Sequence, residues 1–289
     1  MAIGDLLRVT PGSTVDLTAV DPRSTPGLPH DRAVQRDPKG WARADLAARL
    51  LHLADLQERL YASAKVSGDP RRVLLVLQAM DCGGKDGTIK HVIGGLNPSG
   101  VRVTSFGEPT PEERRHHFLW RVRRALPAPG YVGVFNRSHY EDVLVGRVHG
   151  LVPPEVWRRR YDEINRFEAG LAVDGFVIVK AMLHISPEEQ ARRLVARLED
   201  PTKRWKYNPR DTEERARWKE YREGYEAALM KCSTNVAPWY VVPADRKWYR
   251  DWAISHVLGE AMDAMNLRYP QPDYDVEAER KRVESTNPV

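Results

Sequence analysis

A glycine-rich turn between an apolar strand and a helix most constrains what this chain can fold into. The segment reads Leu74-Leu75-Val76-Leu77-Gln78-Ala79-Met80-Asp81-Cys82-Gly83-Gly84-Lys85-Asp86-Gly87-Thr88-Ile89-Lys90. A buried strand followed by glycines, a lysine and a helix is the order of a phosphate-binding loop (P-loop), whose backbone N–H groups and helix N-terminus face an anion. Lys85 directly follows two glycines and would add a point charge. The segment therefore predicts a phosphate site at the edge of a parallel sheet.

The loop departs from the usual G-x-x-x-x-G-K-[ST] pattern at both ends. Ala79 stands where the first glycine is expected, and Asp86 stands where a magnesium-binding hydroxyl is expected. The alternative is a tight turn that needs glycine for its geometry alone. We predict phosphate binding by these loop and helix residues: Gly83, Gly84, Lys85, Asp86, Gly87, Thr88 and Lys90.

Asp81 is the unusual member of this loop. A carboxylate among anion-binding groups repels phosphate unless a cation lies between them or unless it accepts a proton during the reaction. A metal is therefore implied. Oxygen ligands beside phosphates favour Mg²⁺, so Asp81 is a predicted ligand of that ion.

A second polar cluster follows a later apolar strand. Residues 131–135 end at Asn136-Arg137-Ser138-His139-Tyr140-Glu141-Asp142. P-loop kinases hold a metal near their phosphate loop with an acidic group of this kind. Glu141 and Asp142 are the carboxylates available for Mg²⁺, and Arg137 can stabilise the transferred charge, with Asn136 as a further phosphate contact. Alternatively, the two acids complement a helix dipole and pair with Arg137.

Apolar runs and helical stripes alternate along the rest of the chain. Strands are expected at 73–77, 101–106, 131–135, 176–183 and 239–242. Helical spacing appears at 46–60, 157–171, 218–229 and 254–265, and capping signals mark helix starts at Thr110 and Ser186. This alternation predicts an α/β fold, in which helices cover both faces of a five-stranded parallel sheet and ligands bind at the carboxyl ends of the strands.

Two segments concentrate cations. The helix that starts at Thr110 would carry Arg114, His117, Arg121 and Arg124 on one stripe. The helix that starts at Ser186 leads into an arginine-rich segment, where small-molecule P-loop kinases have a lid that excludes water. We therefore expect a lid at about 186–215, with phosphate contacts from Arg193, Arg197, Lys203 and Lys206. A solvated basic surface is the alternative for either segment.

Composition narrows the function classes only slightly. Lys and Arg number 45 against 40 Asp and Glu, a net charge of +5 that suits a polyanionic partner without selecting one. Two cysteines cannot build a disulfide framework or a four-thiolate zinc site. Because the chain also lacks a long apolar run and a signal-like N-terminus, we expect a cytoplasmic protein with no membrane partner.

With these residues assembled, the chain resembles the polyphosphate kinase 2 family from about residue 46 to 269. The resemblance is carried by the motifs at 78–88, 97–100, 135–145, 184–186, 201–206 and 237–243. It implies a three-layer α/β/α P-loop kinase with a helical lid. The Asn136 form of the second motif is similar to the family's third class, which phosphorylates both AMP and ADP. The resemblance thus implies reversible transfer of a phosphoryl group between inorganic polyphosphate and a nucleotide. This transfer would depend on Mg²⁺ and would form ADP and ATP.

The resemblance also sets expectations for roles and organisation. Asp81 would orient the acceptor phosphate and the metal, Lys85 would contact the phosphate chain, and Arg137, Glu141 and Asp142 would line the reaction centre. We expect an N-terminal helical extension at 1–40, the kinase domain at 41–270, a tail at 271–289 and a homo-oligomer. An ATP-dependent small-molecule kinase on the same fold is the alternative. A nucleic-acid-binding module is disfavoured because the chain shows no motif of that class.

Overall fold

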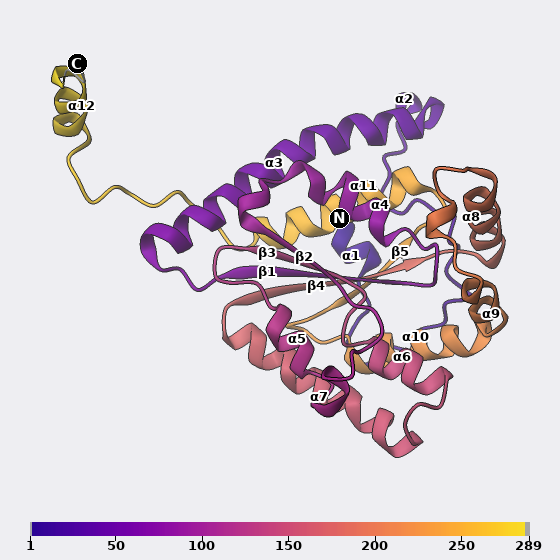
Figure 1. Ribbon diagram of the computed structural model, residues 1–289. Helices are drawn as coiled ribbons and strands as arrows, with labels where there is room; N and C mark the ends of the chain where they lie inside the picture. The colour runs from indigo at the N-terminus through magenta and orange to yellow at the C-terminus, as the bar shows by residue number, and fades with distance from the viewer. Residues whose placement is uncertain (1, 287–289) are drawn as a thin grey trace.

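A five-stranded parallel sheet forms the centre of the computed structural model, which describes residues 2–286 (Figure 1). In spatial order the strands are β2 (Val101–Ser105), β3 (Val132–Asn136), β1 (Arg72–Ala79), β4 (Phe176–His184) and β5 (Trp239–Pro243). Every neighbouring pair is parallel. All of the strands expected from the sequence are confirmed. The inner strand β1 has a run of side chains, from Val73 to Leu77, that are at most 1% exposed.

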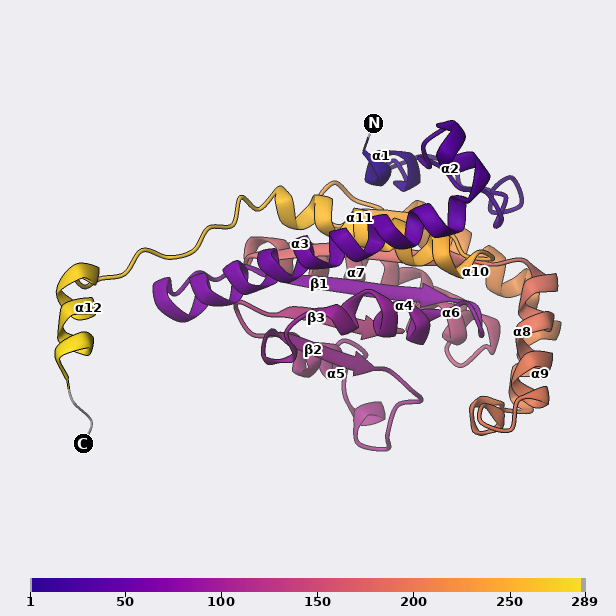
Figure 2. The same ribbon diagram turned by 90° about the horizontal axis from the view of Figure 1, so that it is seen from above.

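Helices cover both faces of this sheet, so the three-layer α/β/α prediction is confirmed (Figures 1 and 2). One face carries α3 (Pro38–Ser67), α4 (Lys85–His91) and α11 (Lys247–Asp263). The other carries α5 (Trp120–Ala125), α6 (Glu141–Val148), α7 (Pro154–Val173) and α10 (Trp218–Cys232). Beyond the carboxyl end of the sheet lie α8 (Pro187–Glu199), the turn η4 (Arg204–Lys206) and α9 (Arg210–Ala216), where the lid is expected. Shorter 3₁₀ turns are η1 (Ile93–Gly95), η2 (Pro98–Gly100) and η3 (Glu113–Arg115).

The N-terminal extension includes α1 (Ile3–Leu7) and α2 (Arg32–Arg36). Its first part, with α1, lies along the outer edge of β5, whereas α2 contacts α3. Arg8 forms an antiparallel bridge with Tyr240, and the Val9 N–H donates to the Trp239 carbonyl at 2.8 Å. An edge strand presents unpaired backbone groups that invite pairing with other chains, and the extension occupies some of them.

The C-terminal segment contains α12 (Val276–Ser285), which lies apart from the body at the end of an extended stretch (Figures 1 and 2). Residues 1 and 287–289 of the expected extension and tail lie outside the described range. Between residues 2 and 286 no helix combines the length and the apolar character that a membrane crossing would need.

The helix expected to start at Thr110 does not form, and this prediction is wrong. The capping box itself is present, because Thr110 N–H donates to the Glu113 carboxylate at 2.8 Å and Glu113 N–H donates to Thr110 Oγ1 at 3.2 Å. Only the turn η3 follows, because His116 is extended and stacks on Trp120 with ring centroids 4.1 Å apart. The next residue, His117, pairs with Glu163 of α7 at 3.0 Å, so a tertiary contact competes here with local propensity. The expected basic stripe of Arg114, His117, Arg121 and Arg124 is lost with the helix.

Substitution of Ser233 tests whether its hydroxyl helps to attach the N-terminal extension to β5. Its buried hydroxyl donates to the Val9 carbonyl at 2.6 Å and accepts from the Trp239 N–H at 3.1 Å. We expect Ser233→Ala to lower the free energy of unfolding by about 1–3 kcal/mol, because two backbone groups lose a buried partner. Urea unfolding measures this change in free energy, and substitution of the exposed Ser67 by alanine is the matched control. Equal midpoints for the two variants would contradict the assignment.

Candidate active site

The turn between β1 and α4 is a backbone cradle at the carboxyl edge of the sheet. Cys82 and Gly84 both have positive φ, of 62° and 108°, and the Gly83 N–H donates to the Met80 carbonyl at 2.9 Å. A residue other than glycine with positive φ is uncommon, and such strain collects at functional sites. The strand-turn-helix geometry predicted from the sequence is therefore present.

Lys85 opens α4 and turns its side chain back over this cradle. Its Nζ donates to the Ala79 carbonyl at 3.0 Å, and the side chain is buried. Burial, followed by the positive charge of Arg137, lowers the pKa of this lysine. An anion in the cradle would raise this pKa again, because an opposite charge favours the ammonium form.

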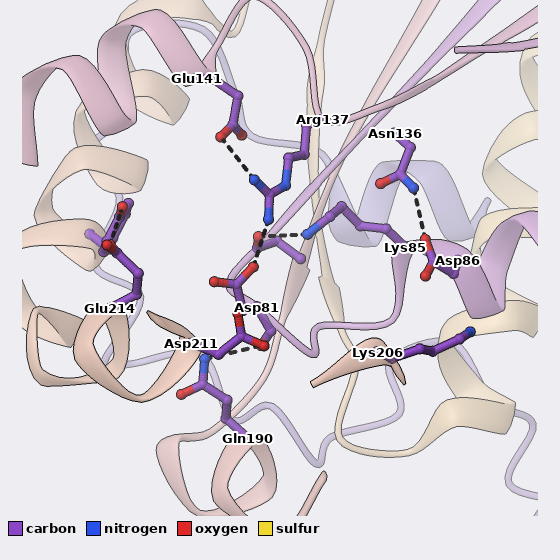
Figure 3. Close-up of polar contacts among 12 residues, drawn as sticks. Asp81, Lys85, Asp86, Asn136, Arg137, Glu141, Gln190, Lys206, Asp211 and Glu214 are labelled. Carbon is purple, nitrogen blue, oxygen red and sulfur yellow. Dashed lines mark hydrogen bonds and ion pairs between the residues drawn. The ribbon is translucent and has the colours of Figure 1, made fainter. Parts of the chain in front are cut away.

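Arg137 connects the two predicted polar clusters (Figure 3). It follows β3 with φ 61°, and its Nη2 donates to Asp81 Oδ1 at 2.8 Å, while Nη1 lies 3.8 Å from Glu141 Oε2. Burial raises the pKa of Glu141, and the positive charges of Arg137 and Lys85 oppose that shift. Four predicted residues from separate elements therefore meet at one place.

Three other predicted residues, Asp86, Thr88 and Lys90, lie at successive positions along α4. Asp86 accepts a hydrogen bond from Asn136 Nδ2 at 2.8 Å, which joins the first turn of α4 to the end of β3. Thr88 instead lies within the helix, where its hydroxyl donates to the Gly84 carbonyl at 3.3 Å. Lys90 is exposed in the last turn of α4, at the opposite end of that helix from the cradle.

Asp142 does not join the expected set of carboxylates. Its side chain lies 3.5 Å from Arg160 and 3.6 Å from Arg121, while its carbonyl accepts from Arg160 at 2.9 Å. Consecutive helical residues point about 100° apart, so Glu141 and Asp142 at the start of α6 face different neighbours. Within residues 2–286, no cluster of three or more His, Cys, Asp or Glu side chains could hold a metal ion. Asp142 therefore lies apart from the other two carboxylates of the predicted triplet, and a metal role for Asp81 and Glu141 stays a prediction.

Arg193, a predicted phosphate contact, is instead used inside the protein. It is 6% exposed, and its guanidinium donates to the Glu189 carboxylate and to the carbonyls of Cys82, Ala244 and Asp245 at 2.6–3.1 Å. Because these acceptors occupy Nε and both Nη atoms, the prediction of a phosphate contact is corrected. Arg193 fastens α8 to the cradle and to the end of β5.

The other expected lid cations lie nearer the surface. Arg197 donates to the Lys206 carbonyl at 3.1 Å and lies 3.4 Å from the Asp211 carboxylate. Lys203 pairs with Asp200, and Lys206 lies over the exposed Trp205 ring, 4.9 Å from its centroid. Each of these side chains contacts groups within residues 200–211, and among the described residues none forms a hydrogen bond or ion pair with Lys85 or Arg137.

Two residues at the site were missed by reasoning from the sequence. Gln190 of α8 donates to the Asp81 carbonyl at 3.0 Å, and Asp211 of α9 approaches the same loop (Figure 3). Burial, followed by the negative charge of Asp81, raises the pKa of Asp211. Both lie within the expected lid, but no pattern distinguishes them from solvent-facing neighbours, so the sequence held no signal for either.

Comparison with known proteins agrees with this geometry. The family described as Polyphosphate kinase 2 (PPK2) matches residues 39–270. The chain belongs to the polyphosphate kinase 2 family. A crystal structure of polyphosphate kinase 2 from Arthrobacter aurescens TC1 superposes with a TM-score of 0.93 at 48% identity, covering 99% of this chain and 98% of that one.

Two curated relatives carry named activities. An AMP/ADP-polyphosphate phosphotransferase from Meiothermus ruber is 48% identical over 266 residues, covering 92% of this chain and 95% of its own length. An ADP-polyphosphate phosphotransferase from Rhodopseudomonas palustris is 43% identical over 238 residues, covering 78% and 81%. The resemblance to the polyphosphate kinase 2 family is thus confirmed, along with its P-loop kinase fold.

Gly84 tests how tightly the family's cradle is built in this chain. The backbone of Gly84 has φ 108°, which is unfavourable for any residue with a Cβ. A Cβ at this position would also collide with the guanidinium of the buried Arg250. We expect Gly84→Ala to lower the free energy of unfolding by at least about 1 kcal/mol, because alanine cannot take this conformation without strain. Gly170→Ala, where a Cβ meets open space in α7, is the control and should leave urea stability unchanged or higher. Equal effects would overturn the assignment.

Proposed function

We propose that this chain transfers a phosphoryl group from inorganic polyphosphate to AMP and ADP, forming ADP and ATP. The observation that carries this is Arg137, which lies between Asp81 of the phosphate loop and Glu141 of α6, beside Lys85. The Meiothermus ruber relative, named for AMP and ADP, supports both acceptors. An ATP-dependent small-molecule kinase is less well supported, because both named relatives use polyphosphate.

The reaction needs positioning and charge neutralisation more than covalent chemistry. An oxygen of the nucleotide's terminal phosphate attacks the terminal phosphorus of polyphosphate. The bridging P–O bond breaks, and its electron pair leaves with the shortened chain. The loop N–H groups and Lys85 hold the phosphates in line, and Arg137 stabilises the charge that develops during transfer.

Asp81 and Glu141 fit a site for Mg²⁺. This ion is commonly bound through one or two carboxylates together with substrate phosphates. Both carboxylates contact one arginine in this structure, with side chains 25% and 15% exposed. When bound, Mg²⁺ would neutralise phosphate charge near the transferred group. Asp142, held by Arg121 and Arg160, is not part of this proposal.

The segment from Arg197 to Asp211 is the proposed source of further cations. Arg197, Lys203 and Lys206 lie there, and the Lys203 side chain is 58% exposed. Cover by this lid would exclude water, which would otherwise hydrolyse the donor. The family match over 39–270 supports a kinase domain at 41–270, with 1–40 as an extension and 271–289 as a tail.

The direct test supplies polyphosphate and Mg²⁺ with AMP or ADP in separate reactions and follows nucleotides over time. We expect ADP and then ATP from AMP, ATP from ADP, and loss of both products when the metal is chelated. Excess Mg²⁺ should restore them. Phosphorylation of an unphosphorylated small molecule from ATP, without nucleotide formation from polyphosphate, would instead support the alternative kinase.

Lys85→Ala tests the loop's role. We expect ATP formation to fall by at least about 100-fold, the usual effect of removing one charge-stabilising group from an active site. Lys39→Ala, an exposed lysine at the start of α3, is the matched control and should keep full activity. Turnover of the Lys85 variant near that of the control would exclude this lysine from the reaction.

A further inference from the structure

Three consecutive buried residues separate Arg137 from Glu141. Ser138, His139 and Tyr140 are at most 1% exposed, so none of them faces the substrate space. The Ser138 hydroxyl accepts from Gln78 Nε2 and from the Tyr140 N–H, both at 3.2 Å. The backbone between Arg137 and Glu141 is therefore held by hydrogen bonds to buried groups.

A charged cluster lies under this segment. Glu168 of α7 accepts from His139 Nε2 at 3.1 Å and from the Tyr140 hydroxyl at 3.0 Å through Oε1, and from Lys180 Nζ of β4 at 2.5 Å through Oε2. Lys180 also donates to the Tyr140 hydroxyl at 2.9 Å and to the Cys232 carbonyl at 2.7 Å. All four side chains of this cluster are at most 2% exposed.

Stability alone is a poor reason for such a cluster. Replacing a buried ion pair with apolar side chains of similar volume often leaves a protein equally or more stable. His139 has a further cost, because its Nδ1 is buried without a hydrogen-bond partner within residues 2–286. A phenyl ring would avoid that cost and keep the contacts with Tyr140 and Phe167, whose ring centroids lie 4.7 and 5.8 Å away.

The arginine that precedes this segment has an unfavourable backbone conformation. Arg137 has φ 61°, a conformation that costs free energy in any residue except glycine and persists only where the surroundings impose it. From that conformation it reaches Asp81 at 2.8 Å. The Arg137 N–H donates to the Leu77 carbonyl at 3.1 Å, and Ser138 is held by Gln78. The contacts of His139 and Tyr140 with Glu168 constrain the next two residues, which lead to Glu141.

We propose that Glu168 is a positioning residue, which acts through His139 and Tyr140 to fix Arg137 and Glu141 for phosphoryl transfer. Lys180 holds the Glu168 carboxylate in place from β4, so the alignment of the reacting loop depends on a buried ion pair between α7 and the sheet. This inference rests on the proposed function. It assigns a role in catalysis to residues that do not touch the substrate.

Two substitutions at position 139 separate hydrogen bonding from packing. His139→Phe keeps an aromatic ring and removes the donor to Glu168. His139→Gln loses the ring and keeps a donor, because its amide nitrogen is separated from Cα by as many bonds as Nε2 is. If the role is positioning, His139→Phe lowers kcat by about 10- to 100-fold with the KM values for AMP and polyphosphate little changed, as expected for a small misplacement of reacting groups. His139→Gln then stays near wild type.

The thermal midpoint of each variant is measured alongside its kinetics. A purely structural role predicts the opposite order, with His139→Phe stable and active and His139→Gln impaired, and that result would overturn the proposal. If His139→Phe does not fold, Tyr140→Phe removes only the hydroxyl that bonds Glu168 and Lys180. Its kcat should fall, and an unchanged kcat would also overturn the proposal. Wild-type protein that forms no ATP from AMP and polyphosphate would instead refute the proposed function.

Discussion

The pairing of β1 with β3 decides where every reacting group lies. The two strands are parallel and in register, with Leu77 opposite Asn136. Because parallel strands end at the same edge of a sheet, the loop after β1 and the loop after β3 open side by side. Asp81 and Arg137 therefore meet, although 56 positions separate them in sequence. A shift of one residue in this register would turn the side chains of β3 to the opposite face and would separate the two loops.

The four side chains where the two loops meet include as many acids as bases. Lys85 and Arg137 lie beside Asp81 and Glu141. A polyphosphate chain brings more negative charge than this quartet can neutralise. Additional cations must then come from elsewhere, which is consistent with Mg²⁺ and a cationic lid. The net charge of +5 for the whole chain is thus a poor guide to the site.

Backbone requirements could be predicted from the sequence, and side-chain partners could not. Strands and the glycine turn follow from local patterns, so all five strands and the cradle were predicted. The fate of Asp142 depends on Arg160, which lies 18 positions later in α7, and that of Arg193 depends on carbonyls such as Ala244 at the end of β5. No local pattern contains such information. At Thr110 the capping box forms as the local pattern predicts, but the helix ends after one turn, where His117 pairs with Glu163 of α7.

Arg193 also changes how the lid should be understood. Its guanidinium joins α8 to the Cys82 carbonyl of the cradle, and Gln190, one turn earlier, donates to the Asp81 carbonyl. Ser186 at the start of the same helix donates twice to the Asp245 carboxylate, at 2.8 and 2.9 Å. The first half of α8 is therefore part of the rigid frame that holds the phosphate loop. The proposed contacts between the lid and a bound phosphate chain therefore rest on the segment beyond it, from Arg197 to Asp211.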